Sequence, residues 1–139
     1  AFFIPYHGKI AEMLARMRRS GPAPMLLSIH SFTPRLSGLD RHWDVGILWN
    51  RDPRLAKPLI AGLRTHEDLH VGDNEPYSGL DLAYTLDVHG TSAGLANGAV
   101  EIRQDRLSDE TDAEHWATLL AAAVKPILAD GEANMVKRF

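Results

Sequence analysis

The chain has 139 residues, with 15 basic and 18 acidic side chains, a formal net charge of -3, seven histidines and no cysteine. Without cysteine there are no disulfides, thiolate metal sites or cysteine nucleophile, so a metal ion has to be held by histidine and carboxylate. The slight acidity argues against nucleic acid as a partner, and no apolar run approaches the roughly 20 residues that span a bilayer. We therefore expect a cytoplasmic protein with neither a membrane nor a nucleic-acid partner.

The first half of the chain predicts two helices and two strands. Apolar residues at three- and four-residue spacing predict an amphipathic helix over residues 7–19. Short apolar runs predict strands over residues 25–29 and 45–49, the first of them in a sheet covered on both faces. Asp52 is a typical helix cap and is followed by proline, which predicts a helix over residues 53–64.

The second half predicts three strands and a long helix. Residues 69–71 and 99–103 are short apolar or alternating segments typical of strands, and residues 84–89 alternate in the same way. Thr111 and Glu114 form a capping box, which predicts the start of the last helix.

The alternation of strands and helices predicts the fold class. We expect a single α/β domain over residues 1–139, with a mixed, largely parallel sheet flanked by helices. The start of the chain is an apolar cluster that contains Phe2, Phe3, Ile4 and Tyr6, where complete chains more often carry polar, poorly ordered residues. From this cluster we expect that the chain is the C-terminal part of a longer domain, incomplete at its N-terminus.

A literal H-E-x-x-H motif, His66-Glu67-Asp68-Leu69-His70, is the first candidate for chemistry. On a helix it would place two imidazoles on one face with a glutamate base between them, as in zincin metalloproteases. The sequence around Asp68 and Gly72 instead predicts a helix end that enters a turn, and no third ligand follows at zincin spacing. A zincin is therefore the minor alternative, and a solvated helix end is the main interpretation.

His30 and Glu101 are the other candidates. His30 ends an apolar strand, and open α/β sheets bind ligands outside the carboxyl ends of their strands. A lone histidine in this position is nevertheless more often structural. Glu101 lies inside a predicted strand, where a carboxylate must be paired or functional because burying an unpaired charge is costly. In the structural interpretation its partner is Arg103, on the same face of the strand, or another arginine.

Five blocks of sequence, taken in order, form a pattern that is far more specific than any of these single motifs. The blocks are Ser28-Ile29-His30-Ser31-Phe32-Thr33-Pro34, Gly46-Ile47-Leu48-Trp49-Asn50, Val71-Gly72-Asp73-Asn74-Glu75-Pro76-Tyr77-Ser78-Gly79, Tyr84-Thr85-Leu86-Asp87-Val88-His89-Gly90 and Glu101-Ile102-Arg103-Gln104-Asp105. Together they resemble the N-formylglutamate amidohydrolase family, from about residue 6 to the last helix. The resemblance implies the phosphorylase/hydrolase-like architecture of the zinc carboxypeptidases and aspartoacylase.

The resemblance also implies one zinc ion, held by an early H-x-x-E segment and by a later histidine at a strand end. His30 matches the later histidine, and Glu101, in a carboxypeptidase-like Glu-x-Arg strand, matches the catalytic glutamate. No H-x-x-E occurs in the sequence, so two of the expected zinc ligands are not in this chain. We expect them before Ala1 in a longer enzyme; the alternative is a family member that has lost its metal.

The activity that the resemblance implies is hydrolysis of the amide of an N-formyl or other N-acyl amino acid, such as N-formylglutamate, to formate and the amino acid. Such a small anionic substrate needs cations and hydrogen-bond donors, for which we expect Arg41, Arg103, Asn74 and Tyr77. The alternative from another functional class is a non-catalytic or truncated domain with an incomplete metal site.

Overall fold

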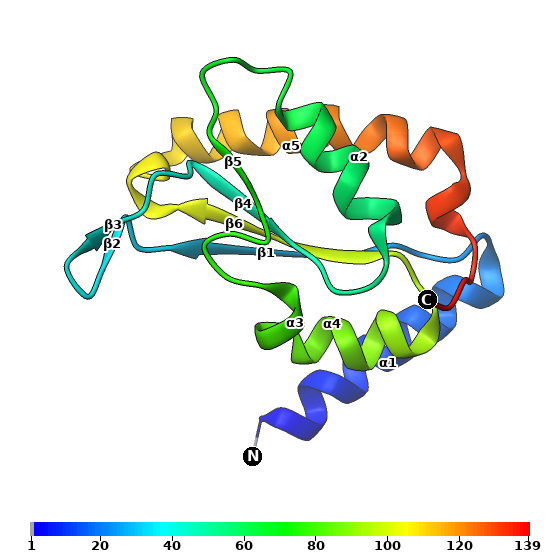
Figure 1. The fold of residues 1–139 in the computed structure, drawn as a ribbon. Helices are drawn as coiled ribbons and strands as arrows, with labels where there is room; N and C mark the ends of the chain where they lie inside the picture. Colours follow the sequence, from blue (N-terminus) through cyan, green and yellow to red (C-terminus); the bar gives the residue numbers. More distant parts are fainter. Residues whose placement is uncertain (1) are drawn as a thin grey trace.

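A computed structural model describes residues 2–139, with the backbone alone for residues 81 and 82 (Figure 1). The strands are β1 (Leu26–Phe32), β2 (Arg35–Leu36), β3 (Leu39–Asp40), β4 (Val45–Leu48), β5 (Val71–Asp73) and β6 (Asn97–Arg103). The α-helices are α1 (Phe3–Ser20), α2 (Pro53–Leu63), α3 (Gly79–Leu82), α4 (Tyr84–His89) and α5 (Glu110–Asp130). Short 3-10 helices are η1 (Thr91–Ala93), η2 (Gln104–Arg106) and η3 (Glu132–Asn134).

The main sheet is mixed and mostly parallel, which confirms the predicted fold class. Its strand order is β1-β6-β4-β5, and β2 and β3 form a separate two-stranded ribbon. The pairs β1–β6 and β4–β5 are parallel, whereas β4 and β6 are antiparallel. Helices α2 and α5 cover one face of the sheet, and α3 and α4 lie on the other (Figure 1). No helix within the described residues 2–139 is long and apolar enough to cross a membrane.

The face under α2 and α5 holds the main hydrophobic core. Alternate residues of the central strands point into it, because side chains along a strand alternate between the two faces. The strands, α2 and α5 contribute Val45, Ile47, Val100, Ile102, Leu55, Leu59, Leu63, Trp116, Leu119, Leu120 and Ile127. The helical members recur at three- and four-residue spacing, as expected for two helices that each pack one face against the sheet.

The caps of these two helices differ in how well they were predicted. Asp52 caps α2 as expected, since its side chain accepts a hydrogen bond from the backbone N–H of Arg54. The capping box at Thr111 is wrong: Asp109 is the N-cap of α5, and its carboxylate accepts from the N–H of Asp112 at 3.0 Å. Aspartate is the stronger cap of the two, so the helix begins before Thr111, which lies inside its first turn.

The segment predicted as a strand over residues 84–89 is the helix α4. Its alternation of apolar and polar residues does not correspond to an alternation of burial. Leu86 is buried, but Tyr84 and Val88 are 60% and 43% exposed, so the segment has one inward-facing apolar residue rather than an apolar strand face. Six residues are too few to distinguish the periodicity of a strand from that of a helix. Packing against the sheet therefore decides that this segment is helical.

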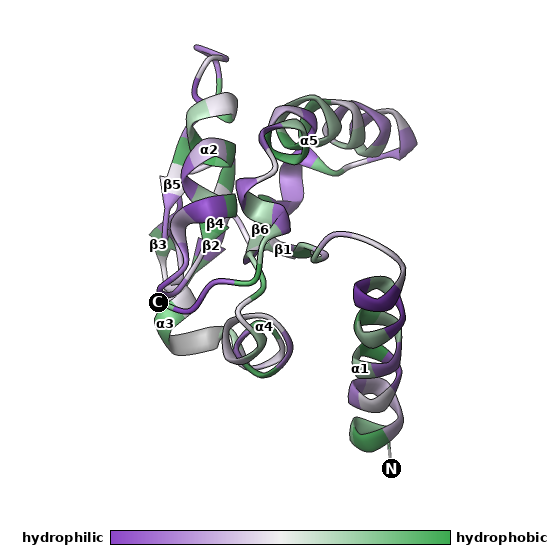
Figure 2. Ribbon diagram, turned by 90° about the vertical axis from the view of Figure 1, so that its right-hand side faces the viewer, coloured by the Kyte–Doolittle hydropathy of each residue, from purple (hydrophilic) through white to green (hydrophobic). Residues whose placement is uncertain are grey.

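The expectation that both faces of the first strand are covered is wrong, and the strand also lies at the edge of the sheet. β1 pairs only with β6 in the described part of the chain, and Ile29 is 53% exposed. Helix α1 buries none of its residues, and Figure 2 shows it standing apart on the β1 side of the molecule. It is held largely at its start, where His7 Nδ1 lies 2.8 Å from His89 Nε2 and the two rings are stacked.

Candidate active site

His30 and Glu101 lie side by side near the carboxyl ends of β1 and β6, each two residues before the last residue of its strand. The parallel register pairs their Cα atoms directly, and both residues line one pocket on the α4 side of the sheet. On its other side, the register pairs Glu101 with Gly46 of β4. The row across the three strands therefore presents an imidazole, a carboxylate and a position without a side chain.

Gly46 is needed because the loop after β5 lies against the sheet at this point. A Cβ atom on residue 46 would collide with the carbonyl oxygen of Glu75. The absence of a side chain thus lets the loop pack beside Glu101, and the same loop brings Tyr77 to the pocket. The glycine lies in one of the blocks that carry the family resemblance.

Glu101 is partly buried, and its surroundings shift its proton affinity. Burial raises the pKa of its carboxyl group above the ordinary value, while the nearby imidazole of His30 and guanidinium of Arg41 act in the opposite direction without cancelling the effect. A carboxylate with a raised pKa accepts and returns a proton more readily near neutral pH. The geometry therefore suits Glu101 for proton transfer.

A pocket of about 300 Å³ opens in front of this pair. It is lined by Ser28, His30, Leu48, Tyr77, Ala83, Tyr84, Thr85, Leu86, Ala99 and Glu101. The residues from α4 were missed as site residues, because the sequence predicted a strand there. Their only signal in the sequence is that they fall inside one of the five blocks.

Arg41 is held in a fixed position next to this pocket. Its guanidinium donates to the hydroxyl of Tyr77 at 2.8 Å and to the carbonyl oxygen of Thr33 at 3.3 Å. The same group lies over the rings of Tyr77 and Phe32, at 4.8 and 5.7 Å from their centroids. Stacking and hydrogen bonding together orient a cation that cannot lose its proton. The structure thus brings four of the predicted site residues together: His30, Glu101, Arg41 and Tyr77.

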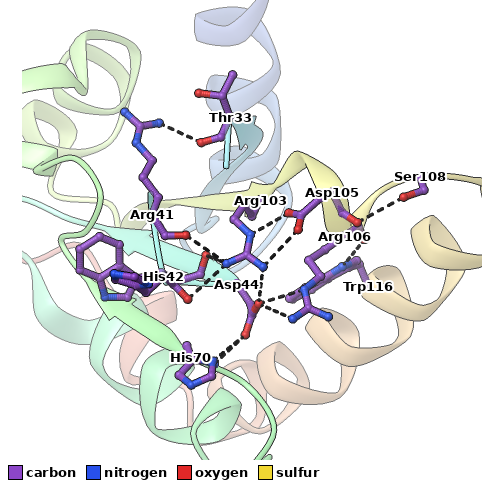
Figure 3. A network of polar contacts seen from close by, with 11 residues as sticks. Thr33, Arg41, His42, Asp44, His70, Arg103, Asp105, Arg106, Ser108 and Trp116 are labelled. Atoms are coloured by element: carbon purple, nitrogen blue, oxygen red, sulfur yellow. Dashed lines mark hydrogen bonds and ion pairs between the residues drawn. The ribbon is translucent and has the colours of Figure 1, made fainter. Parts of the chain in front are cut away.

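Arg103 lies in a structural network instead (Figure 3). It donates to the carbonyl oxygens of residues 41–43 and forms ion pairs with Asp44 and Asp105. Its partners are therefore these two aspartates rather than Glu101. Arg103 is not among the described residues that line the pocket, and its contacts fix the segment that leads into β4.

Asn74 folds the loop after β5. Its side-chain oxygen accepts hydrogen bonds from the backbone N–H groups of Trp49 and Gly79, at 2.8 and 3.1 Å. Its own backbone adopts the left-handed conformation, with φ of 55°, which asparagine tolerates better than most residues. Like Arg103, Asn74 is absent from the described lining of the pocket, so the contacts seen here serve loop structure.

The H-E-x-x-H segment does not form the zincin arrangement. Residues 64–68 are turns that follow α2, so His66 and His70 do not share a helix face. The ring of His70 lies 3.1 Å from the carboxylate of Asp44. His66 lines a larger groove of about 710 Å³ between α2 and α5, on the opposite side of the sheet from Glu101. Across described residues 2–139, no three histidine, aspartate or glutamate side chains converge into a group that could hold a metal.

Comparison with known proteins shows similarity to an amidohydrolase family rather than to a zincin metalloprotease. Residues 1–108 match the model of the family described as N-formylglutamate amidohydrolase. The crystal structure of a gene product from Agrobacterium tumefaciens matches 93% of this chain and 51% of its own, with a TM-score of 0.82 and 32% sequence identity.

A second solved structure is similar in fold. The N-formylglutamate amidohydrolase from Ralstonia eutropha matches 94% of this chain and 50% of its own, with a TM-score of 0.62 and 19% identity. The chain thus spans about half the length of both solved structures that it matches here. A search of curated protein sequences gives no match.

Proposed function

Because the chain belongs to the N-formylglutamate amidohydrolase family, we propose that its site hydrolyses the amide bond of a small N-acyl amino acid. The products are a carboxylic acid, which is formate for an N-formyl substrate, and the free amino acid. The observation that carries this proposal is the direct pairing of His30 with Glu101 at two strand ends, beside the oriented guanidinium of Arg41.

Zinc, which the family resemblance implies, does not fit the residues of this chain alone. A catalytic zinc site takes three protein ligands and leaves one position open for water or substrate. Among the described residues, the pocket brings together one histidine and one carboxylate, and no group of three converges. His30 alone matches a ligand of the implied ion, so the steps below use only side chains of this chain.

Glu101 is the proposed proton carrier. Its carboxylate accepts a proton from water while the water oxygen forms a bond to the amide carbonyl carbon. The carboxyl group then gives this proton to the amide nitrogen as the carbon–nitrogen bond breaks. A pKa raised above the ordinary value favours both halves of this cycle, because it moves the proton affinity of the carboxyl group toward neutral pH.

Arg41 is the proposed anion partner of the substrate. A guanidinium binds a carboxylate through two parallel hydrogen bonds. Every N-acyl amino acid carries such a group, its α-carboxylate. Tyr77 and Thr33 fix the side chain before the substrate arrives, so little conformational freedom is lost on binding.

Replacing Glu101 with Gln tests the assignment directly. The amide keeps the shape of the side chain but cannot carry the proton, so we expect kcat for N-formylglutamate or other N-formyl amino acids to fall by about 10² to 10⁴. Formate release is the measurement, and circular dichroism verifies folding. Glu114→Gln, the same change at an exposed position of α5, is the matched control and should leave kcat unchanged. Full activity of Glu101→Gln would remove Glu101 as the base.

A non-catalytic binding domain is the second candidate, and the incomplete set of metal ligands favours it. This candidate predicts that N-acyl amino acids bind without being cleaved. Calorimetric titration combined with the formate assay separates the two, since binding without any formate release by the unmodified chain supports the binding domain.

A further inference from the structure

One wall of the pocket that contains Glu101 is the short helix α4. Tyr84, Thr85 and Leu86 of α4 line the pocket, whereas His30 and Glu101 reach it from the strands β1 and β6. The helix has only six residues, and helices this short are not stable in water by themselves. The residue before it forms no side-chain cap hydrogen bond. The position of this wall therefore depends on the contacts that hold α4 from outside.

Two contacts hold the middle of α4 on the sheet. Leu86 packs into a buried apolar cluster with Leu48 and Ala99. The carboxylate of Asp87 accepts a hydrogen bond from the side-chain amide of Asn50, just after β4, at 3.1 Å. Leu86 and Asp87 are neighbours, roughly 1.5 Å apart along the helix axis. Two anchors so close together hold a helix on a sheet but restrain its tilt only weakly.

A third contact comes from α1 and reaches the last residue of α4. This residue, His89, is 9% exposed, and its Nε2 lies 2.8 Å from Nδ1 of His7. The two ring planes are nearly parallel, at 19°, and the ring centroids are 5.1 Å apart. A neutral imidazole has one donor and one acceptor nitrogen, so a single proton between the facing nitrogens makes this contact a hydrogen bond.

His7 also contacts the other end of α4. Its ring lies edge-on to the ring of Tyr84, with the centroids 5.5 Å apart, and such aromatic contacts are favourable beyond the area that they bury. Tyr84 is the first residue of α4 and His89 the last, so the two lie roughly 7.5 Å apart along the axis. One side chain of α1 thus touches both ends of the helix, which is the arrangement that restrains its tilt.

We propose that His7 is a positioning residue for the pocket: through His89 and Tyr84 it fixes the tilt of α4, and with it the wall against which the substrate binds. This role rests on the proposed amidohydrolase function and goes beyond it, because α1 contributes none of the described residues that line the pocket. The strand register, not α4, holds His30 beside Glu101. His7 therefore acts on substrate binding more than on proton transfer.

Replacing His7 with Ala tests the role. The variant lacks both contacts with α4, so amide hydrogen exchange in residues 84–90, read by mass spectrometry, should become at least about threefold faster. From formate release we expect KM for N-formylglutamate to rise about three- to tenfold, with kcat changed by less than about twofold. His115→Ala, the same substitution at an exposed position of α5, is the matched control and should change none of these values.

Two further measurements distinguish positioning from a general loss of stability. Exchange in α2, which lies in the closed core, is the internal reference and should stay unchanged in His7→Ala, because a global loss of stability would raise it as well. His7→Asn places an amide group where Nδ1 of the imidazole lies, so it can keep the hydrogen bond to His89. We expect this conservative variant to recover at least about half of the lost exchange protection in α4.

The outcomes separate this role from the function on which it rests. Unchanged exchange in residues 84–90 of His7→Ala, or an equal rise in α2, refutes the positioning role even if the unmodified chain hydrolyses N-formylglutamate. A fall in kcat with KM unchanged also refutes it, because His7 would then act on the chemistry and not on the pocket wall. If exchange rises as expected but the unmodified chain releases no formate, His7 still positions α4, and the proposed function fails.

Discussion

The two faces of the sheet differ in what covers them. On one face, α2 and α5 seal a continuous apolar core in which Leu55, Leu59 and Leu63 have no exposed surface. On the other, the buried cluster is limited to Leu48, Leu86 and Ala99, and the pocket that contains His30 and Glu101 opens beside it. The same strands serve both faces, because their alternate residues point in opposite directions.

This difference shows how one short sheet combines a closed apolar core with an accessible pocket. A half-buried carboxylate such as Glu101 is costly in a sealed core, but it is tolerated beside a pocket that water can enter. The closed face supplies the free energy that holds the strands in register, and the register is what pairs His30 with Glu101. The following experiments test this division, from the largest expected effect to the smallest.

Leu59→Ala should be the most damaging of these substitutions. Removing a fully buried leucine leaves a cavity, so the free energy of unfolding should fall by about 2–5 kcal/mol. Urea denaturation measures the change. Leu128→Ala, at a 49% exposed position of α5, is the control and should stay within about 0.5 kcal/mol of the original chain. A loss below about 1 kcal/mol for Leu59→Ala would contradict the role assigned to the closed face.

Asp44→Asn should be nearly as costly, because it removes the negative centre of a buried network (Figure 3). Asp44 is 1% exposed and pairs with Arg103 and Arg106, so the change leaves two arginines without their shared partner. We expect a loss of about 3 kcal/mol in the free energy of unfolding. Urea denaturation at neutral pH is the measurement, and Asp40→Asn, at an exposed ion pair, is the control that should change little.

The same network predicts a dependence on acid. Burial by itself would raise the pKa of Asp44, but hydrogen bonds from His70 and the charges of Arg106 and Arg103 outweigh it and hold the pKa below its ordinary value. The folded state thus binds this proton less readily than the unfolded state, so the stabilisation is complete above the ordinary pKa of about 3.9 and is lost as pH falls below it. The Asp44→Asn variant should lack this part of the acid dependence.

His89 tests the attachment of α1 on the open face. Burial and the neighbouring His7 lower the pKa of His89, so the folded state resists protonation. Stability from this contact is present above the ordinary histidine pKa of about 6.5 and decreases as pH falls below it, by about 1 kcal/mol or less. Thermal unfolding at pH 7.5 and 5.5 measures the change, and His89→Phe should reduce it. An unchanged pH response in this variant would contradict the interpretation.

Two isoleucines give the finest comparison. Ile47→Val in the closed core should cost about 1 kcal/mol of the free energy of unfolding, because it removes one buried methyl group. Ile29→Val on the exposed edge strand should cost less than about 0.5 kcal/mol, because most of that methyl group's surroundings are water. Urea denaturation of both variants compares the edge with the centre of the sheet, and equal costs would contradict the exposure of Ile29 on β1.

Local signals determined the elements whose patterns are long or carry strong caps. The apolar stripes of α2 and α5 and the Asp52 cap are read correctly from the sequence, because each depends on residues within a few positions of one another. The helix α4 was misread because six residues contain too little periodicity to distinguish a helix from a strand. The expectation that both faces of β1 are covered was wrong because the coverage of a strand depends on how helices distant in sequence pack on the sheet.

The sequence by itself determined the family and the α/β class, and it predicted His30 and Glu101 as site residues, because these inferences depend on residue types in a fixed order. Only the tertiary structure decided which of the predicted side chains meet. It paired His30 with Glu101 through the β1–β6 register, gathered Arg41 and Tyr77 beside them, and placed Arg103 in the Asp44 network. The physical reason is distance along the chain: residues far apart in sequence become neighbours only when strand order and register bring them together.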